Sequence, residues 1–304
     1  MGGRSMSLDS FAPIDPKLID VVLPEHDGYP DELAAEDTAD ALWEACGAAS
    51  RKFPASLWIE PRHWAEKARE NDANNTWAMN YIDRFTNQNP THECTCHSLR
   101  ANFEAARNRQ LGIIFPDGPK KGYRYDESTR GSVWVSPLSV YAEANPRKTG
   151  GANVRQVLEI ACRRGMLPEK IQPHEYNFKH TLIGTTGAGG LNQSRGSWVS
   201  VKNFPDGWQE TSADFMPLEV IFSEMWEQNI CLMLHSMADS CGRNGHAVPR
   251  SQLIFEGNNL KAAAYPDSYD VIRYDSLATI KRSWSGCFSI NTVTAPDDWS
   301  KPAG

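Results

Sequence analysis

The stretch that decides the fold is Gln88-Asn-Pro-Thr-His-Glu-Cys-Thr-Cys-His-Ser-Leu-Arg-Ala-Asn-Phe-Glu-Ala-Ala-Arg107, which is predicted to begin as a loop and end as a helix. Pro90 disfavours helix in the residue before it. Beyond Cys94, the apolar residues Leu99 and Phe103 recur at the period of one helix face. We therefore expect Cys94 in the first turn of an amphipathic helix, where free N–H groups and the helix dipole favour the nucleophilic thiolate.

This stretch resembles the papain-like cysteine peptidases, because Gln88 precedes Cys94 by six residues and a Thr and a helix follow the Cys. The run Glu-Cys-Thr-Cys-His-Ser most resembles the bacterial and phage branch, although Glu93 stands where Gly or Ser is usual. In that family the Cys opens the long central helix and a Gln side chain donates to the oxyanion. The resemblance implies an α+β, two-lobed papain-like fold, with a helical first lobe around a central helix and an antiparallel β second lobe.

A cysteine nucleophile needs a base within hydrogen-bond reach. His246 is the best candidate, because its Gly-His-Ala-Val context and its distance from Cys94 resemble those of the family's base. The weaker candidates are His92, His97, His180 and His235.

The base in turn needs a third group that orients its ring. The run Tyr265-Pro-Asp-Ser-Tyr-Asp270 resembles the family's Asn-Ser-Trp-Gly and puts Asp267 at the Asn position. An Asp can orient the imidazole, as it does in Ser-His-Asp triads. Because the family uses Asn there, we expect Asp267→Asn to retain activity. Asn258 and Asn259 are alternatives, although their Gly-Asn-Asn context is typical of a turn.

These four residues predict a papain-like cysteine peptidase or amide hydrolase that acts on a peptide or protein substrate. Cys94 is the nucleophile, His246 the base, Asp267 the orienting group and Gln88 the oxyanion donor. The alternative is a structural or interaction protein on a degenerate papain-like fold. By resemblance to the phage-rich branch, it would be a bacteriophage virion component that contacts other virion proteins.

The composition argues against several other classes of protein. The chain has 304 residues and a net charge of −7 without a basic stripe, so we expect no nucleic-acid partner. No apolar run has the length of a membrane span, and the first residues lack the apolar segment of a signal peptide. Seven cysteines without a secretory signal predict reduced thiols. We expect a cytoplasmic protein, or one located in the virion if it is phage-encoded.

Neither a metal nor a cofactor is expected. His92, Cys94, Cys96 and His97 could be suspected of binding zinc, but tetrahedral sites draw their ligands from two separated pairs. The glycine-rich run Gly184–Gly190 lacks the strand before it and the Gly-Lys-Ser/Thr after it that a phosphate loop requires.

The domain organisation is predicted from shifts in composition and periodicity. We expect an extended N-terminal arm over residues 1–35 and a papain-like domain over 36–304. Within that domain we expect a helical lobe at about 80–170, a polar insertion at 172–215 and a β-rich lobe at about 216–295. Helices are predicted at 35–52, 61–70, 136–141, 154–164 and 217–227, and strands at 112–115, 132–135, 230–234, 252–255, 260–264, 271–274 and 287–293.

Overall fold

The computed structural model describes residues 50–86, 88, 93–120, 134–144, 152–166, 218–243, 246–269, 271–282 and 286–293. The predicted arm and the polar insertion lie outside these residues, as does most of the helix predicted at 35–52. The last three residues of that predicted helix, Ser50–Lys52, instead form strand β1, so the prediction is wrong there.

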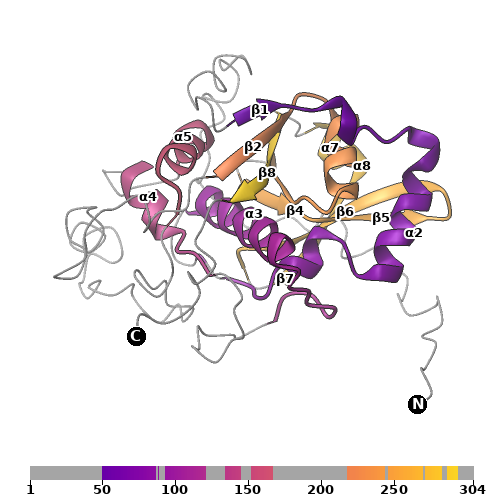
Figure 1. The fold of residues 1–304 in the computed structure, drawn as a ribbon, viewed down its shortest axis with the longest axis horizontal. Coiled ribbons are helices and arrows are strands. Elements are labelled where there is room, and N and C mark those ends of the chain that lie inside the picture. Colours follow the sequence, from indigo (N-terminus) through magenta and orange to yellow (C-terminus); the bar gives the residue numbers. More distant parts are fainter. Residues whose placement is uncertain are drawn as a thin grey trace.

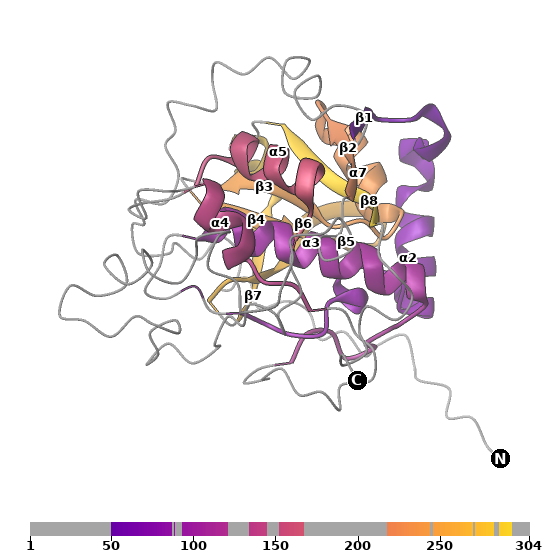
Figure 2. The ribbon, with the colours of Figure 1, turned by 60° about the vertical axis from the view of Figure 1, so that its left-hand side comes forward.

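The central helix α3 spans Cys94–Leu111, which confirms the prediction from the periodicity of its apolar residues. It ends at Gly112, whose positive φ of 69° is a conformation that glycine adopts without strain. Helix α4 (Leu138–Ala144) and helix α5 (Val154–Arg164) follow, and α5 has the predicted bounds. In Figures 1 and 2, α3 crosses the middle of the molecule and α4 and α5 lie together beside it.

The described strands form two sheets. The strands are β1, β2 (Leu218–Ser223), β3 (Asp239–Arg243), β4 (His246–Arg250), β5 (Gln252–Glu256), β6 (Asn259–Asp267), β7 (Val271–Ser276) and β8 (Cys287–Val293). The first sheet has the order β1-β2-β8-β3-β4, and the second has the order β5-β6-β7. All pairs are antiparallel except β1 with β2. Only Ser251 separates β4 from β5, so the chain passes directly from one sheet into the other.

Shorter helices complete the described elements. They are the 3₁₀ turns η4 (Ala55–Leu57), η5 (Pro61–His63) and η6 (Ala78–Tyr81) and the helices α2 (Trp64–Asn74), α7 (Trp226–Leu234) and α8 (Leu277–Arg282). The helix predicted at 61–70 therefore begins as the 3₁₀ turn η5 and continues as α2.

Several local predictions are wrong. The segment predicted as a helix at 217–227 forms β2, and the predicted strand at 230–234 belongs to α7. The run 230–234 is apolar throughout, and such a short segment does not distinguish a buried strand from a buried helix, so its packing partners decide. Residues 112–115 form no strand: Gly112 is in a turn after α3 and 113–115 have no regular secondary structure. At 132–135 the described residues contain only an isolated bridge at Val135.

Two apolar cores combine elements from both halves of the chain. In the first, α3, α4 and α5 pack against β2 and β8, with Leu99, Phe103 and Leu158 fully buried. In the second, α2, α7 and α8 pack against the second sheet, around Trp77 and Leu253. Figure 1 shows α2 at the right-hand end of the molecule beside β5. Helix α3 contacts α4 and α5 as well as strands β3, β4 and β8.

Cys94, Cys96, Cys162 and Cys231 are buried and form no disulfide. Cys287 is disulfide-bonded, so the prediction of reduced thiols is wrong for this residue. None of the described helices has both the length and the apolar character that crossing a bilayer requires.

Candidate active site

Cys94 is the first residue of α3, and its side chain is buried. The N–H groups of a helix's first turn have no acceptor within the helix, so they point toward any group that lies at this end. The Cys94 thiol interacts with the side chain of His246 and with the backbone of Ala247 at the start of β4. The nucleophile predicted from sequence therefore lies against the base predicted from sequence.

His246 opens β4, and Asp267 ends β6. His246 Nε2 lies 2.9 Å from Asp267 Oδ1, and both side chains are buried. This contact leaves Nδ1, the other ring nitrogen, for the Cys94 thiol, and such hydrogen bonds are often long when no substrate is bound. The order is thiol, imidazole and carboxylate, which is the arrangement of a nucleophile, a base and a group that orients the base.

The electrostatics favour a charged pair of thiolate and imidazolium. Burial raises the pKa of the Cys94 thiol, but the hydrogen bond and charge of His246 and the Ala247 backbone outweigh it, and the net shift is downward. Burial lowers the pKa of His246, but its contacts with Asp267 and Cys94 outweigh that effect and raise the pKa to about 10. The two groups thus stabilise each other's ionised form.

Asp267 remains ionised although it is buried. Burial raises the pKa of its carboxyl group, but His246 and Arg273 together lower it below the ordinary value. Arg273 on β7 donates through Nε to Asp267 Oδ2 at 2.6 Å, a partner that the sequence did not reveal. The alternative orienting group Asn258 lies at the exposed turn between β5 and β6, where it accepts from Arg69. Asn259, at the start of β6, is exposed as well.

Gln88 lies beside the residues that follow Asp267. Its backbone N–H donates to the Ser268 carbonyl at 2.8 Å, and its Oε1 accepts from the Ser268 hydroxyl at 2.6 Å. Its Nε2 donates to the Tyr269 hydroxyl at 2.8 Å. The two hydroxyls thus hold the side-chain amide of Gln88 in place from both ends.

Tyr269 stands where the resembling family has Trp, and its role is visible only in the structure. Its ring lies 5.6 Å from the His246 ring, tilted by 37°, so it covers part of the imidazole. Burial raises the pKa of Tyr269, and the charges of Asp267 and Cys94 raise it further, so the hydroxyl stays protonated. Tyr269 thus connects His246 with Gln88.

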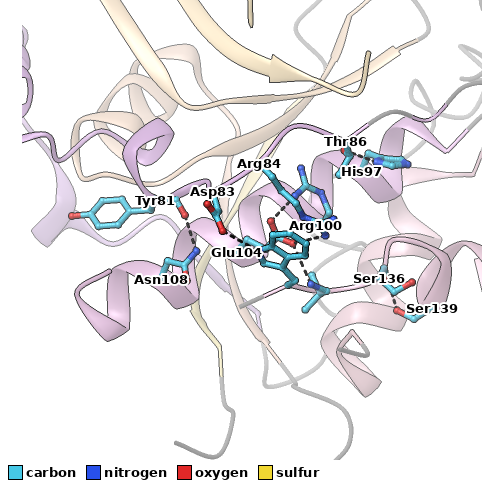
Figure 3. A network of polar contacts seen from close by, with 12 residues as sticks. Tyr81, Asp83, Arg84, Thr86, His97, Arg100, Glu104, Asn108, Ser136 and Ser139 are labelled. Atoms are coloured by element: carbon cyan, nitrogen blue, oxygen red, sulfur yellow. Dashed lines mark hydrogen bonds and ion pairs between the residues drawn. The ribbon is translucent and has the colours of Figure 1, made fainter. Parts of the chain in front are cut away.

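A polar network holds the segment before Gln88 against α3 (Figure 3). The Tyr81 carbonyl accepts from Asn108 Nδ2 at 2.9 Å, and Thr86 Oγ1 lies 2.8 Å from His97 Nδ1. Between these contacts, Arg84 Nη2 lies 3.5 Å from Glu104 Oε1. The segment that carries Gln88 is therefore fastened to the helix that carries Cys94.

Glu104 also fastens α3 to the segment before α4. Its Oε2 accepts from Arg100 at 2.5 Å, and its Oε1 accepts from the Val135 backbone N–H at 3.1 Å. The neighbouring Trp134 donates to Asp83 at 3.0 Å, and its ring lies 3.9 Å below the Arg84 guanidinium. One buried carboxylate thus joins three segments of the chain (Figure 3).

Cys96 and His97, which belong to the suspected zinc site, make separate contacts within the fold. Cys96 packs in the first apolar core. His97 uses Nδ1 for Thr86, and its Nε2 lies 3.7 Å from Glu93 Oε2, so its ring supports the scaffold rather than the thiol. Among the described residues, no group of three or more His, Cys, Asp or Glu side chains could hold a metal ion. His92 lies outside the described residues, as does His180.

His235 ends α7, where its backbone carbonyl accepts from Arg109 at 2.9 Å. Burial lowers the pKa of its ring. Arg109 lies in the last turn of α3, whereas Cys94 is the first residue of this helix. His235 therefore lies at the opposite end of α3 from Cys94.

Comparisons with known proteins support the architecture. No protein-family model and no curated protein sequence matches the chain. Among solved structures, procathepsin B S9 from Trypanosoma congolense matches with a TM-score of 0.50 and 7% sequence identity, over 89% of this chain and 87% of that chain. Xylellain, a cysteine protease from Xylella fastidiosa, matches with a TM-score of 0.42 and 12% identity, over 69% of this chain and 83% of that chain. Procathepsin L 3 from the midgut of Tenebrio molitor larvae matches with a TM-score of 0.44 and 9% identity, over 82% and 78% of the two chains.

The fold assignment rests on the procathepsin B match together with the observed elements. A central helix that begins with a cysteine packs against antiparallel strands, one of which begins with a histidine. At these identities the likeness concerns the fold alone. The chain therefore has an α+β, papain-like fold.

Proposed function

We propose that the chain is a cysteine peptidase or a related amide hydrolase that acts on peptide bonds. The observation that carries the proposal is the buried contact of 2.9 Å between His246 and Asp267, beside a Cys94 whose thiol pKa is lowered. If His246 and Asp267 only stabilised the fold, their contact would not require a thiol at the N-terminus of a helix beside them. Geometry and electrostatics thus favour the same chemistry.

The reaction follows from the positions of these atoms. The Cys94 thiolate attacks the carbonyl carbon, and the resulting oxyanion is stabilised by the Cys94 backbone N–H and by Gln88 Nε2. The His246 imidazolium gives its proton to the leaving amine, and the C–N bond breaks to leave a thioester. Water then loses a proton to His246 and attacks the thioester. The acid product leaves, and the thiolate and imidazolium are restored.

Contacts among the described residues support these proposed roles. Asp267 holds the His246 ring so that Nε2 carries its proton toward the carboxylate and Nδ1 faces the thiol. Ser268 and Tyr269 hold the Gln88 amide in place through both of its ends, and Nε2 is the end that donates to Tyr269. Nδ1 can therefore exchange a proton with the thiol and then with the leaving amine.

The proposal is tested with a peptidyl electrophile that alkylates the thiolate of cysteine peptidases. We expect stoichiometric labelling of Cys94 at neutral pH, no labelling of Cys94→Ala, and nearly unchanged labelling of the matched control Cys96→Ala. A fluorogenic peptide amide should be hydrolysed with the same dependence on the two variants. Labelling that is lost with Cys96→Ala and retained with Cys94→Ala would contradict the assignment of the nucleophile.

The alternative function is that of a structural or interaction protein in a bacteriophage virion, on a papain-like scaffold without turnover. Glu93, which is fully buried next to Cys94, supports this alternative because the resembling family has a small residue there. If neither labelling nor hydrolysis depends on Cys94, this second function is the better one.

A further inference from the structure

The position of Arg273 follows from the pairing of β6 with β7. In this antiparallel register, Val271 lies opposite Asp267 and Arg273 lies opposite Tyr265. Residues displaced by two positions on neighbouring strands are diagonal neighbours on one face, within reach of a long side chain. Arg273 reaches across this diagonal to Asp267, and only 16% of its side chain is exposed.

The two oxygens of Asp267 have different partners. Oδ1 faces His246 Nε2 at 2.9 Å, and Oδ2 accepts from Arg273 Nε at 2.6 Å. Both partners are donors when His246 carries a proton on Nε2. A carboxylate satisfies two donors, whereas an asparagine amide offers one acceptor and one donor group.

We propose that Arg273 is a positioning residue that orients the Asp267 carboxylate and requires an aspartate, rather than an asparagine, at this position. The inference rests on the proposed function, because its consequence for activity passes through His246 and Cys94. It changes the expectation from the sequence that Asp267→Asn retains activity.

The consequence of Asp267→Asn follows from the geometry. The amide oxygen turns toward the charged Arg273 donor, because charge-assisted hydrogen bonds are the stronger ones. The amide NH₂ group then faces His246 Nε2, which must act as an acceptor. The imidazole proton is forced onto Nδ1, where it faces Cys94 and prevents the ring from accepting the thiol proton.

Arg273→Gln offers a matched variant. In glutamine, Oε1 and Nε2 are bonded to Cδ, as Nε is in arginine, so the amide can occupy the place of the Arg273 Nε atom. With Asp267 retained, the glutamine NH₂ group donates to Oδ2 and only the positive charge is lost. With Asp267→Asn, the glutamine oxygen accepts from the asparagine NH₂ group, which lets the asparagine oxygen face His246 again.

The charged and titratable groups around His246 set the sign of the pH effect. They are Cys94 from α3, Asp267 from β6, Tyr269 after it and Arg273 from β7. Arg273 opposes the negative charge of Asp267 and so lowers the stabilisation of the imidazolium. Its removal in Arg273→Gln should therefore move the basic limb of the pH–rate profile upward.

The experiment compares the full chain with Asp267→Asn, Arg273→Gln, the double variant and Arg273→Met. The first readout is the pH profile of kcat/KM with one fluorogenic peptide amide. The second is the absorbance of the Cys94 thiolate at 240 nm against pH, taken as the difference from Cys94→Ala. Since this second readout needs no substrate, it tests the orientation of the triad even if the peptide is not hydrolysed, which would contradict only the proposed function.

We expect Asp267→Asn to lower kcat/KM by at least about 10²-fold. In a Ser-His-Asp triad, replacing the Asp by Asn produces the wrong imidazole tautomer and lowers kcat by ~10⁴-fold. Its thiolate midpoint should rise by about one pH unit or more, because the opposite charge of the imidazolium is lost. The double variant should recover at least about tenfold in activity, as the restored orientation predicts. Arg273→Gln should stay active and Arg273→Met should be impaired.

The proposal is overturned if Asp267→Asn alone keeps nearly the activity and thiolate midpoint of the unchanged chain. It is also overturned if the double variant is no better than Asp267→Asn while Arg273→Gln alone is active. If Asp267→Asn does not fold, Arg273→Gln and Arg273→Met still decide, since equal loss in both would contradict a role for the hydrogen bond.

Discussion

Replacing Glu104 by Ala should strongly destabilise the protein, because this carboxylate is fully buried and joins three segments. It bonds Arg100 at 2.5 Å, Arg84 at 3.5 Å and the Val135 N–H at 3.1 Å. Breaking a buried ion pair from one side typically costs about 3–5 kcal/mol, because the remaining charge stays buried. The loss of the acceptor for the backbone N–H adds about 1–3 kcal/mol where no water replaces it.

A loss of about 4 kcal/mol or more would be a large part of the roughly 5–15 kcal/mol by which domains are stable. We would measure it by urea unfolding, followed by tryptophan fluorescence and by far-UV circular dichroism. Glu104→Gln keeps the shape and one acceptor, so it should cost less than Glu104→Ala. The exposed Glu66 on α2 provides the control, and Glu66→Ala should change stability by no more than about 0.5 kcal/mol.

The same substitution should impair the candidate active site even in the folded fraction. Glu104 holds Arg84, and the segment from Arg84 leads to Gln88, which supplies one of the two oxyanion donors in the proposed mechanism. A misplacement of about 1 Å can cost on the order of 10²-fold in rate. A change in unfolding free energy below about 1 kcal/mol for Glu104→Ala would refute the reasoning that this carboxylate is the buried counter-charge.

Two further predictions concern the chemistry. Gln88→Ala should lower kcat by about 10²–10³-fold, with little change in KM, because it removes one oxyanion donor and leaves the thiolate intact. Steady-state kinetics measure this loss, and retained labelling of Cys94 shows that the thiolate still forms. An effect on KM alone would contradict the prediction. Activity should rise with pH as Cys94 ionises, at a pKa below that of an ordinary thiol, and should fall as pH passes through the His246 pKa of about 10. A profile that rises only above pH 9, or that falls near pH 6.5, would show that the ion pair does not form.

The core of the candidate site could be predicted from short segments of sequence. Gln88 and Cys94 are separated by a fixed short distance, and the helix after Cys94 has a clear apolar period that Gly112 ends. His246 and Asp267 were identified by resemblance of their immediate neighbours to a known pattern. The structure brings these two residues to 2.9 Å, although 21 positions separate them in the chain.

Predictions of secondary structure from hydrophobic periodicity were wrong for two segments that are largely buried. The run from Ile230 to Leu234 is apolar throughout, and the structure makes it part of the buried helix α7. The sequence after Pro217 predicts a helix, but Leu218–Ser223 pair with β1 and β8 as a strand. Periodicity does not decide such cases, since most side chains of both elements are buried.

What the sequence by itself determined is the helix that begins at Cys94, because helix period and helix ends are properties of neighbouring residues. What only the tertiary structure decided is how the ionised groups are oriented. Arg273 contacts Asp267 only through the register of β6 and β7, and Tyr269 reaches Gln88 only because the chain closes around α3. Strand register and long-range hydrogen bonds depend on residues far apart in sequence, so no local pattern encodes them.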